Sequence, residues 1–234
     1  MRKVLILESV LVLALLLGGC TQSDGTDGQE SSTVTSESSE MTSEFSNVTS
    51  ESRDVSGFNE VELNGVGNLS IQQTGSESLT VEAEEDVLPK LRTEVENNRL
   101  IIGPKPNTII HTTEPINYKL TVKDLNALEV SGSGNVDAES ISTDKLAVTV
   151  NGAGDVKVAG RADSQDIDIS GSGDYRAGDL ESKEVKIEVG GSGSAVVNVS
   201  DELNAKVSGS GSVKYIGDPT VNQDVSGAGR VSKY

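Results

Sequence analysis

The residues most able to do chemistry in this chain follow a short turn of two glycines that recurs six times. In three consecutive copies the residue after the second glycine is Asn135, Asp155 and Asp174. If the turns stack, these side chains form one column, with Asp155 one repeat away from Asp174. Two neighbouring carboxylates repel, which favours a bound cation or a raised pKa. The pattern indicates a candidate Ca²⁺ site at these three residues, or a carboxylate pair for glycoside cleavage.

The same residue types also have a conformational use, because Asp, Asn and Ser suit the exits of turns. Other catalytic signals are weak. His111 is the single histidine, and no second histidine or nearby cysteine accompanies it in a metal or catalytic motif. No nucleophile elbow, HExxH helix or phosphate-binding loop occurs. We therefore expect no enzymatic activity and no cofactor beyond the candidate Ca²⁺. In a polysaccharide-cleaving alternative, Arg161 and Arg176 are the basic candidates.

One further residue has a chemical use at the start of the chain. Residues 1–19 combine a basic start, an apolar run and small residues, which is typical of a signal peptide. They end in LLGGC, so we predict a lipoprotein signal with Cys20 as the acylated residue. Cys20 is the only cysteine and cannot form an internal disulfide. The prediction places the protein in the cell envelope, outside the cytoplasm, with the lipid bilayer as partner. The alternative is an ordinary signal peptide and an unused thiol.

The next segment is predicted to be a flexible tether. Residues 20–52 are rich in Ser, Thr and acidic residues, and their few apolar residues cannot build a core. The remaining head, residues 53–234, has 17 basic and 29 acidic residues, a net charge of −12. A surface this acidic repels nucleic acid, so we expect no nucleic-acid partner.

The repeat itself predicts the architecture that positions the chemical residues. The first glycines of the six turns are spaced by 18 to 20 residues, which is typical of a solenoid. Apolar and polar residues alternate before and after each turn, as in Leu146–Val150 and Val185–Val189, and this indicates strands. The turn glycines are Gly132, Gly134, Gly152, Gly154, Gly171, Gly173, Gly191, Gly193, Gly209, Gly211, Gly227 and Gly229.

Units this short have no room for a crossover helix, so a single-stranded parallel β-helix with coils of about 18–20 residues is predicted. Glycine is expected at each corner because it adopts positive φ without steric cost. The residue between the two glycines is always Ser or Ala, which indicates crowded corners. The alternative is a sandwich or barrel of hairpins, but hairpins rarely keep one turn at one spacing six times.

A less regular region, residues 53–124, precedes the repeat and is expected to cap one end of the solenoid. It opens with a diverged coil, Val61–Ile71. Further strands are predicted at Leu79–Ala83, Leu91–Val95, Leu100–Ile102 and Tyr118–Val122, with a tight turn at Asn97 and Asn98. Tyr118 and Tyr234 are expected to be exposed, whereas Tyr175 and Tyr215 occupy core positions.

Residues 53–234 resemble the putative auto-transporter adhesin, head GIN domain family. The resemblance lies in the opening Val55-Ser-Gly-Phe-Asn-Glu-Val61, in Thr93-Glu-Val-Glu-Asn-Asn-Arg-Leu100, and in SGSGNV with its echoes. It implies a right-handed β-helix in a secreted or lipid-anchored prokaryotic protein. The family has no agreed catalytic residues, so the resemblance implies none here.

These observations predict a non-enzymatic surface lipoprotein whose β-helical head presents flat acidic faces to an unidentified surface protein or glycan. Two other classes of function stay open. One is an envelope enzyme acting on polysaccharide, and the other is a structural module that self-associates through its C-terminal end, residues 231–234.

Overall fold

The computed structural model describes residues 47–234. The predicted signal peptide, Cys20 and nearly all of the predicted tether lie outside the described residues. The described chain is built from strands, with a single 3₁₀ turn. Within residues 47–234 no helix has the length and apolar character needed to cross a membrane.

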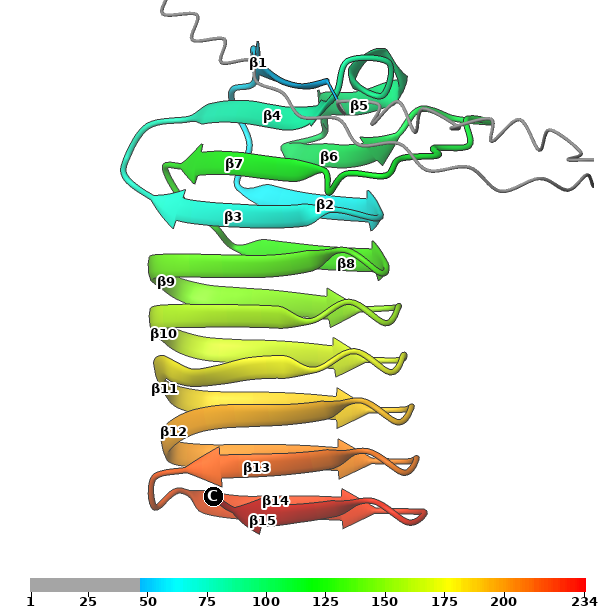
Figure 1. Cartoon of the computed structure of the whole chain (residues 1–234). Coiled ribbons are helices and arrows are strands. Elements are labelled where there is room, and N and C mark those ends of the chain that lie inside the picture. Colours follow the sequence, from blue (N-terminus) through cyan, green and yellow to red (C-terminus); the bar gives the residue numbers. More distant parts are fainter. Residues whose placement is uncertain (1–46) are drawn as a thin grey trace, which may run out of the picture. The chain divides into compact units, whose positions relative to one another are not determined.

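The predicted solenoid is present, with about five turns (Figure 1). Four long strands, β9 to β12, each bend midway. We call the wall formed by their first halves the first wall, and the wall formed by their second halves the second wall. The start of β9 pairs in parallel with β3, whereas its end pairs in parallel with β8. The solenoid strands are β8 Ala127–Gly132, β9 Asn135–Val150, β10 Val156–Ile169, β11 Tyr175–Val189, β12 Ser194–Val207, β13 Ser212–Ile216, β14 Thr220–Val225 and β15 Arg230–Lys233.

The N-terminal region continues both walls and then closes them with antiparallel strands. β3 and β7 extend the first wall, and β4 and β1 finish it in antiparallel pairs. β2 and β6 extend the second wall, and β5 finishes it. The elements are β1 Val48–Arg53, β2 Glu60–Gly65, β3 Asn68–Gln73, β4 Ser78–Glu84, the 3₁₀ turn Leu88–Lys90, β5 Leu91–Glu96, β6 Arg99–Pro104 and β7 Asn117–Val122.

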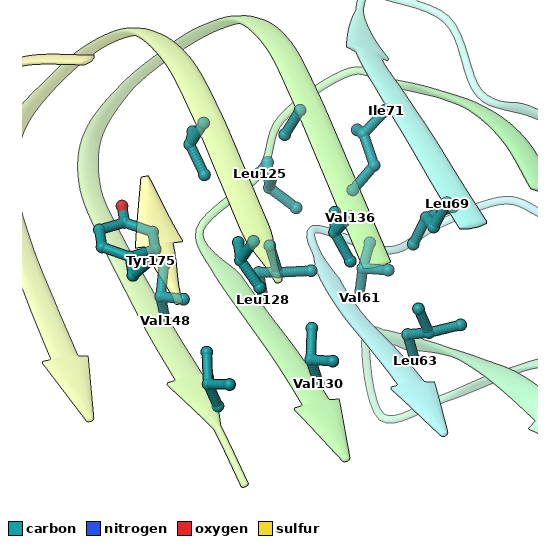
Figure 2. Close-up of a cluster of buried hydrophobic side chains, with 14 of the residues drawn as sticks. Val61, Leu63, Leu69, Ile71, Leu125, Leu128, Val130, Val136, Val148 and Tyr175 are labelled. Atoms are coloured by element: carbon teal, nitrogen blue, oxygen red, sulfur yellow. The ribbon is translucent and has the colours of Figure 1, made fainter. Parts of the chain in front are cut away.

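The core fills the space between the two walls. Figure 2 shows Leu69 and Val136 of the first wall near Val61, Leu128 and Val130 of the second wall. All five side chains are at most 3% exposed. This alternation of inward apolar and outward polar residues is the pattern that predicted the strands, and burial of the apolar side chains is the main source of stability.

Most expectations for the capping region are confirmed. All four predicted strands occur, and Asn97 and Asn98 form the turn between β5 and β6 with φ of 49° and 72°. One boundary was wrong, because β1 begins at Val48, inside the predicted tether. Its side chains are mostly exposed and it pairs with β4 through its backbone, so no apolar alternation marks it. Tyr118 was also predicted wrongly, since it is only 1% exposed.

The corner glycines are required for a different reason from the predicted one. Of the twelve, only Gly132 and Gly227 have φ in the left-handed region. At the other positions a larger residue is excluded by lack of space. A Cβ at Gly152 or Gly171 would overlap the carbonyl oxygen of the glycine stacked in the preceding coil. The residues between the glycines, such as Ser133 and Ser172, are exposed rather than crowded. The corner is tight between coils and open to solvent.

One buried polar network crosses the core. The Tyr175 hydroxyl donates to Gln165 Oε1 at 2.7 Å, and Gln165 Nε2 donates to Ser182 Oγ at 2.7 Å. Gln165 and Ser182 are the buried polar side chains of the described residues. The network links a residue of the first wall to one of the second, and its mutual hydrogen bonds offset the desolvation of three polar groups.

Coils differ in length at the bend between the two walls. β9 has 16 residues whereas β12 has 14, and the pairing register shifts between Val158 and Gly160 and between Ala177 and Glu181. The bend also contains Gly160 with φ of 131°. The opposite edge, with the glycine corners, keeps its register in every coil.

Candidate functional site

The predicted column of polar residues exists on the outer surface of the first wall. The strand register places Asn135 beside Asn68, and the neighbouring pairs place Asp155 and Asp174 one and two coils further on. The three residues of the candidate Ca²⁺ site are therefore brought together. The column comprises Asn68, Asn135, Asp155, Asp174, Ser194, Ser212 and Arg230.

A ladder of hydrogen bonds joins the members of this column. The backbone N–H of Asp155 donates to Asn135 Oδ1 at 3.0 Å, and that of Asp174 donates to Asp155 Oδ1 at 3.2 Å. The N–H of Ser194 donates in turn to Asp174 Oδ1 at 3.1 Å. Each side chain satisfies a main-chain donor of the next coil at the turn exit. This gives Asn and Asp a structural use at these positions.

Arg176 occupies the remaining carboxylate oxygens. Its Nη2 lies 2.9 Å from Asp155 Oδ2 and 3.2 Å from Asp174 Oδ2. One guanidinium therefore bridges the two stacked carboxylates and offsets their repulsion. The other basic candidate, Arg161, lies elsewhere and pairs with Asp163 at 3.2 Å. Both arginines are therefore paired with carboxylates of this chain.

The Ca²⁺ site stays a prediction, and the geometry sets a condition on it. Among residues 47–234 no group of three or more His, Cys, Asp or Glu side chains is gathered around one point where a metal could sit. The oxygens of Asp155 and Asp174 already accept hydrogen bonds from backbone N–H groups and from Arg176. A cation at this column would have to displace the guanidinium.

Replacement of Arg176 by alanine should favour a cation here. In Arg176→Ala the two carboxylates lose their shared donor, so Ca²⁺ is expected to stabilise the variant more than the native protein. At free Ca²⁺ a hundredfold above the Kd, the gain in free energy of unfolding is about 2.7 kcal/mol. Thermal unfolding with Ca²⁺ and with a chelator measures it. Arg161→Ala is the control, and equal stabilisation of all three proteins would contradict the prediction.

A shallow groove of about 540 Å³ lies beside the column on the same wall. It runs across β4, β7, β3, β9, β10 and β11, which follow one another in the sheet. We call it the asparagine groove, because three asparagines lie along it. The lining residues are Asn68, Leu69, Ser70, Glu82, Asn117, Tyr118, Lys119, Asn135, Val136, Asp137, Asp155, Lys157 and Arg176.

The three asparagine amides form a ladder along the groove. Asn68 Nδ2 donates to Asn117 Oδ1 at 3.1 Å, and Asn135 Nδ2 donates to Asn68 Oδ1 at 3.4 Å. Charged pairs flank the ladder. Lys119 lies 2.5 Å from Glu82, and Lys157 lies 3.4 Å from Asp137. The charged side chains along the groove are therefore paired with one another.

Tyr118 belongs to the strand that crosses the groove, but its ring is buried in the core. Burial raises the pKa of its phenol, and the nearby charge of Arg53 opposes this effect. The Tyr118 hydroxyl has no hydrogen-bond partner among the described residues. It therefore contributes packing and not a titrating group at the surface. His111, by contrast, is exposed in the loop between β6 and β7.

Sequence reasoning missed the groove and the bridging role of Arg176. Part of the ladder was readable, because Gly65-Val-Gly-Asn68 echoes Gly132-Ser-Gly-Asn135 and places one asparagine over the other. Asn117 carried no such signal. It belongs to β7, which enters the wall next to β3 although 43 residues separate the end of β3 from its start.

A family model described as "putative auto-transporter adhesin, head GIN domain" matches residues 57–219. A solved structure of a putative adhesin from Bacteroides fragilis NCTC 9343 is 24% identical, with a TM-score of 0.68 over 80% of this chain and 97% of its own. A putative lipid binding protein from Parabacteroides distasonis ATCC 8503 is 22% identical, with a TM-score of 0.55 over 80% and 97%. At these identities the similarity establishes a shared fold. No curated protein matches the chain.

Proposed function

Because this chain belongs to the putative auto-transporter adhesin, head GIN domain family, we propose that it is a non-enzymatic, adhesin-like binding module of the cell envelope. The observation that carries the proposal is the open groove on the outer surface of the first wall. The groove is open along several strands and its charged groups are paired with one another. Such a surface suits the binding of an extended partner better than the enclosure of a small substrate.

The anchor is part of the same proposal. Cys20 at the end of LLGGC carries the lipid, and residues 21–47 connect it to the head. Two acyl chains, or one with a second signal, give lasting attachment to a bilayer. The head is then held at the outer surface of a membrane, where a binding partner on an envelope or extracellular surface is within reach.

A cell-based assay tests binding and anchoring together. Cells producing the full chain are expected to bind to members of an array of envelope glycans and surface proteins. Mass spectrometry of the surrounding solution is expected to detect no cleavage products. The matched control is Cys20→Ala, which should move both the protein and its binding activity from the membrane fraction to the medium.

The outcomes separate the alternatives. Released oligosaccharides would overturn the proposal and support the polysaccharide-cleaving enzyme. Absence of binding to any arrayed material, together with self-association of the purified chain, would support a structural module instead. A Cys20→Ala variant that stays in the membrane fraction would contradict the lipid anchor alone.

A further inference from the structure

We propose that the asparagine groove binds a neutral, hydroxyl-rich polysaccharide, laid across the strands and held by side-chain amide N–H groups. The inference rests on the proposed binding function and names the chemistry of the partner. Four observations carry it: the free donors along the groove, its balanced charge, its lack of exposed large apolar side chains and its strand repeat.

The ladder leaves amide hydrogens unused. Each Asn Nδ2 has two hydrogens. Asn68 and Asn135 each use one of them within the ladder. Asn117 Nδ2 makes no hydrogen bond to any described residue, so both of its hydrogens are available. In the next outward-facing row, between Lys119 and Asp137, Ser70 is exposed, and its hydroxyl is unpaired within residues 47–234. The groove therefore offers a row of donors to acceptor oxygens of a ligand.

The charges of the groove cancel locally, although the head as a whole is strongly acidic. Lys119, Lys157 and Arg176 each pair with a carboxylate of the groove, and these carboxylates belong to Glu82, Asp137 and Asp155. A basic peptide would meet no unpaired carboxylate in the groove. An acidic polymer would be repelled by the head's net charge of −12. The charge balance favours an uncharged ligand.

Apolar and backbone-pairing partners are disfavoured by the same surface. The exposed large apolar side chains of the described residues are Val48, Val66, Ile109, Val225 and Tyr234, and none of them lines the groove. The central strands β3, β9 and β10 are paired on both sides, so a peptide strand cannot be added there. What remains is recognition through polar side chains.

The repeat of the groove matches a polymer. Neighbouring strands are spaced by about 4.8 Å, so the amides of Asn117, Asn68 and Asn135 on β7, β3 and β9 recur at that interval. An extended β-linked pyranose chain advances by a similar distance per sugar and presents hydroxyl oxygens at each step. The five neighbouring strands β7, β3, β9, β10 and β11 span about 19 Å, or four strand spacings. A few consecutive sugars would fill this length.

Calorimetric titration of the full chain tests the inference, using a soluble linear β-linked glucan, a polyuronate, poly-glutamate and poly-lysine as probes. We expect binding of the glucan and weaker or no binding of the charged polymers. In Asn117→Asp the accepting Oδ1 that serves Asn68 is kept while both donors are lost. Glucan binding should weaken about tenfold, as for one lost hydrogen bond.

Asn222→Asp is the charge control on the second wall, where Asn222 Nδ2 donates to Glu202 Oε1 and Asn204 Oδ1. It adds the same charge and should leave glucan affinity unchanged. Asn117→Ala separates loss of donors from added charge and should weaken binding similarly. Glucan binding that is unaffected by both Asn117 variants would overturn the inference. So would strong binding of a charged polymer alone, and in that case the proposed binding function would still stand.

Discussion

Gly191→Ala is expected to destabilise the protein by about 3 kcal/mol. A Cβ at this corner would overlap the carbonyl oxygen of Gly171 in the preceding coil. That oxygen cannot simply move away, because it accepts hydrogen bonds from the N–H groups of Ser192 and Gly193 at 3.1 and 3.2 Å. The methyl group must therefore separate two coils or break both bonds. Urea unfolding followed by circular dichroism measures the loss.

The neighbouring residue is a built-in control. A Cβ at Gly190 would lie 3.9 Å from the carbonyl oxygen of Ile169, an ordinary contact. Ser170 and Ser208 occupy the equivalent position in adjacent coils. Gly190→Ala should therefore change stability by less than about 0.5 kcal/mol. Equal stabilities of the two variants would contradict the predicted overlap at Gly191.

Stability is expected to fall steeply at alkaline pH because two tyrosines are buried in the core. Burial raises the pKa of Tyr175 and of Tyr118 above the ordinary value of 10.0. The unfolded chain then loses these protons first, so stability is complete below about pH 10 and falls as the pH rises above it. Two such groups give a slope of up to about 2.7 kcal/mol per pH unit.

Phenylalanine variants isolate this effect from the titration of exposed lysines. Tyr118→Phe removes a buried hydroxyl that has no partner among the described residues, so it should be neutral or stabilising at pH 7 and should halve the alkaline slope. Tyr175→Phe should also halve the slope, but at pH 7 it should cost about 1–3 kcal/mol because Gln165 Oε1 loses its donor. An unchanged slope in both variants would contradict the assignment. Urea titrations across the pH range provide the data.

The repeated part of the fold was predictable because each coil repeats one local pattern. Period-two alternation and a turn of fixed spacing are enough to assign Val136, Val148 and Tyr175 to the core, where all three are buried. The antiparallel strand pairs at the N-terminal end were not predictable. Both β1 and β7 pair with β4 in the first wall, through backbone contacts between residues far apart in sequence. Tyr118 was misjudged for the same reason, since its neighbours come from other segments.

The site was predictable only where it follows the repeat. The column of Asn135, Asp155 and Asp174 comes directly from the coil register. Arg176 could not be assigned to it, because the direction of a long flexible side chain is not encoded by spacing. The reason for the corner glycines was also misread, since contact between coils cannot be seen from one turn alone.

The contrast between the two edges of the solenoid has an evolutionary consequence. At the glycine corner every coil must fit the one before it, so an inserted residue would disturb two neighbours at once. At the bend, where β9 and β12 already differ in length by two residues, extra residues are absorbed by a local bulge. Lineages descending from this protein should therefore acquire new loops along the bend, while duplication or loss of a whole coil would lengthen or shorten the array without redesign of its core.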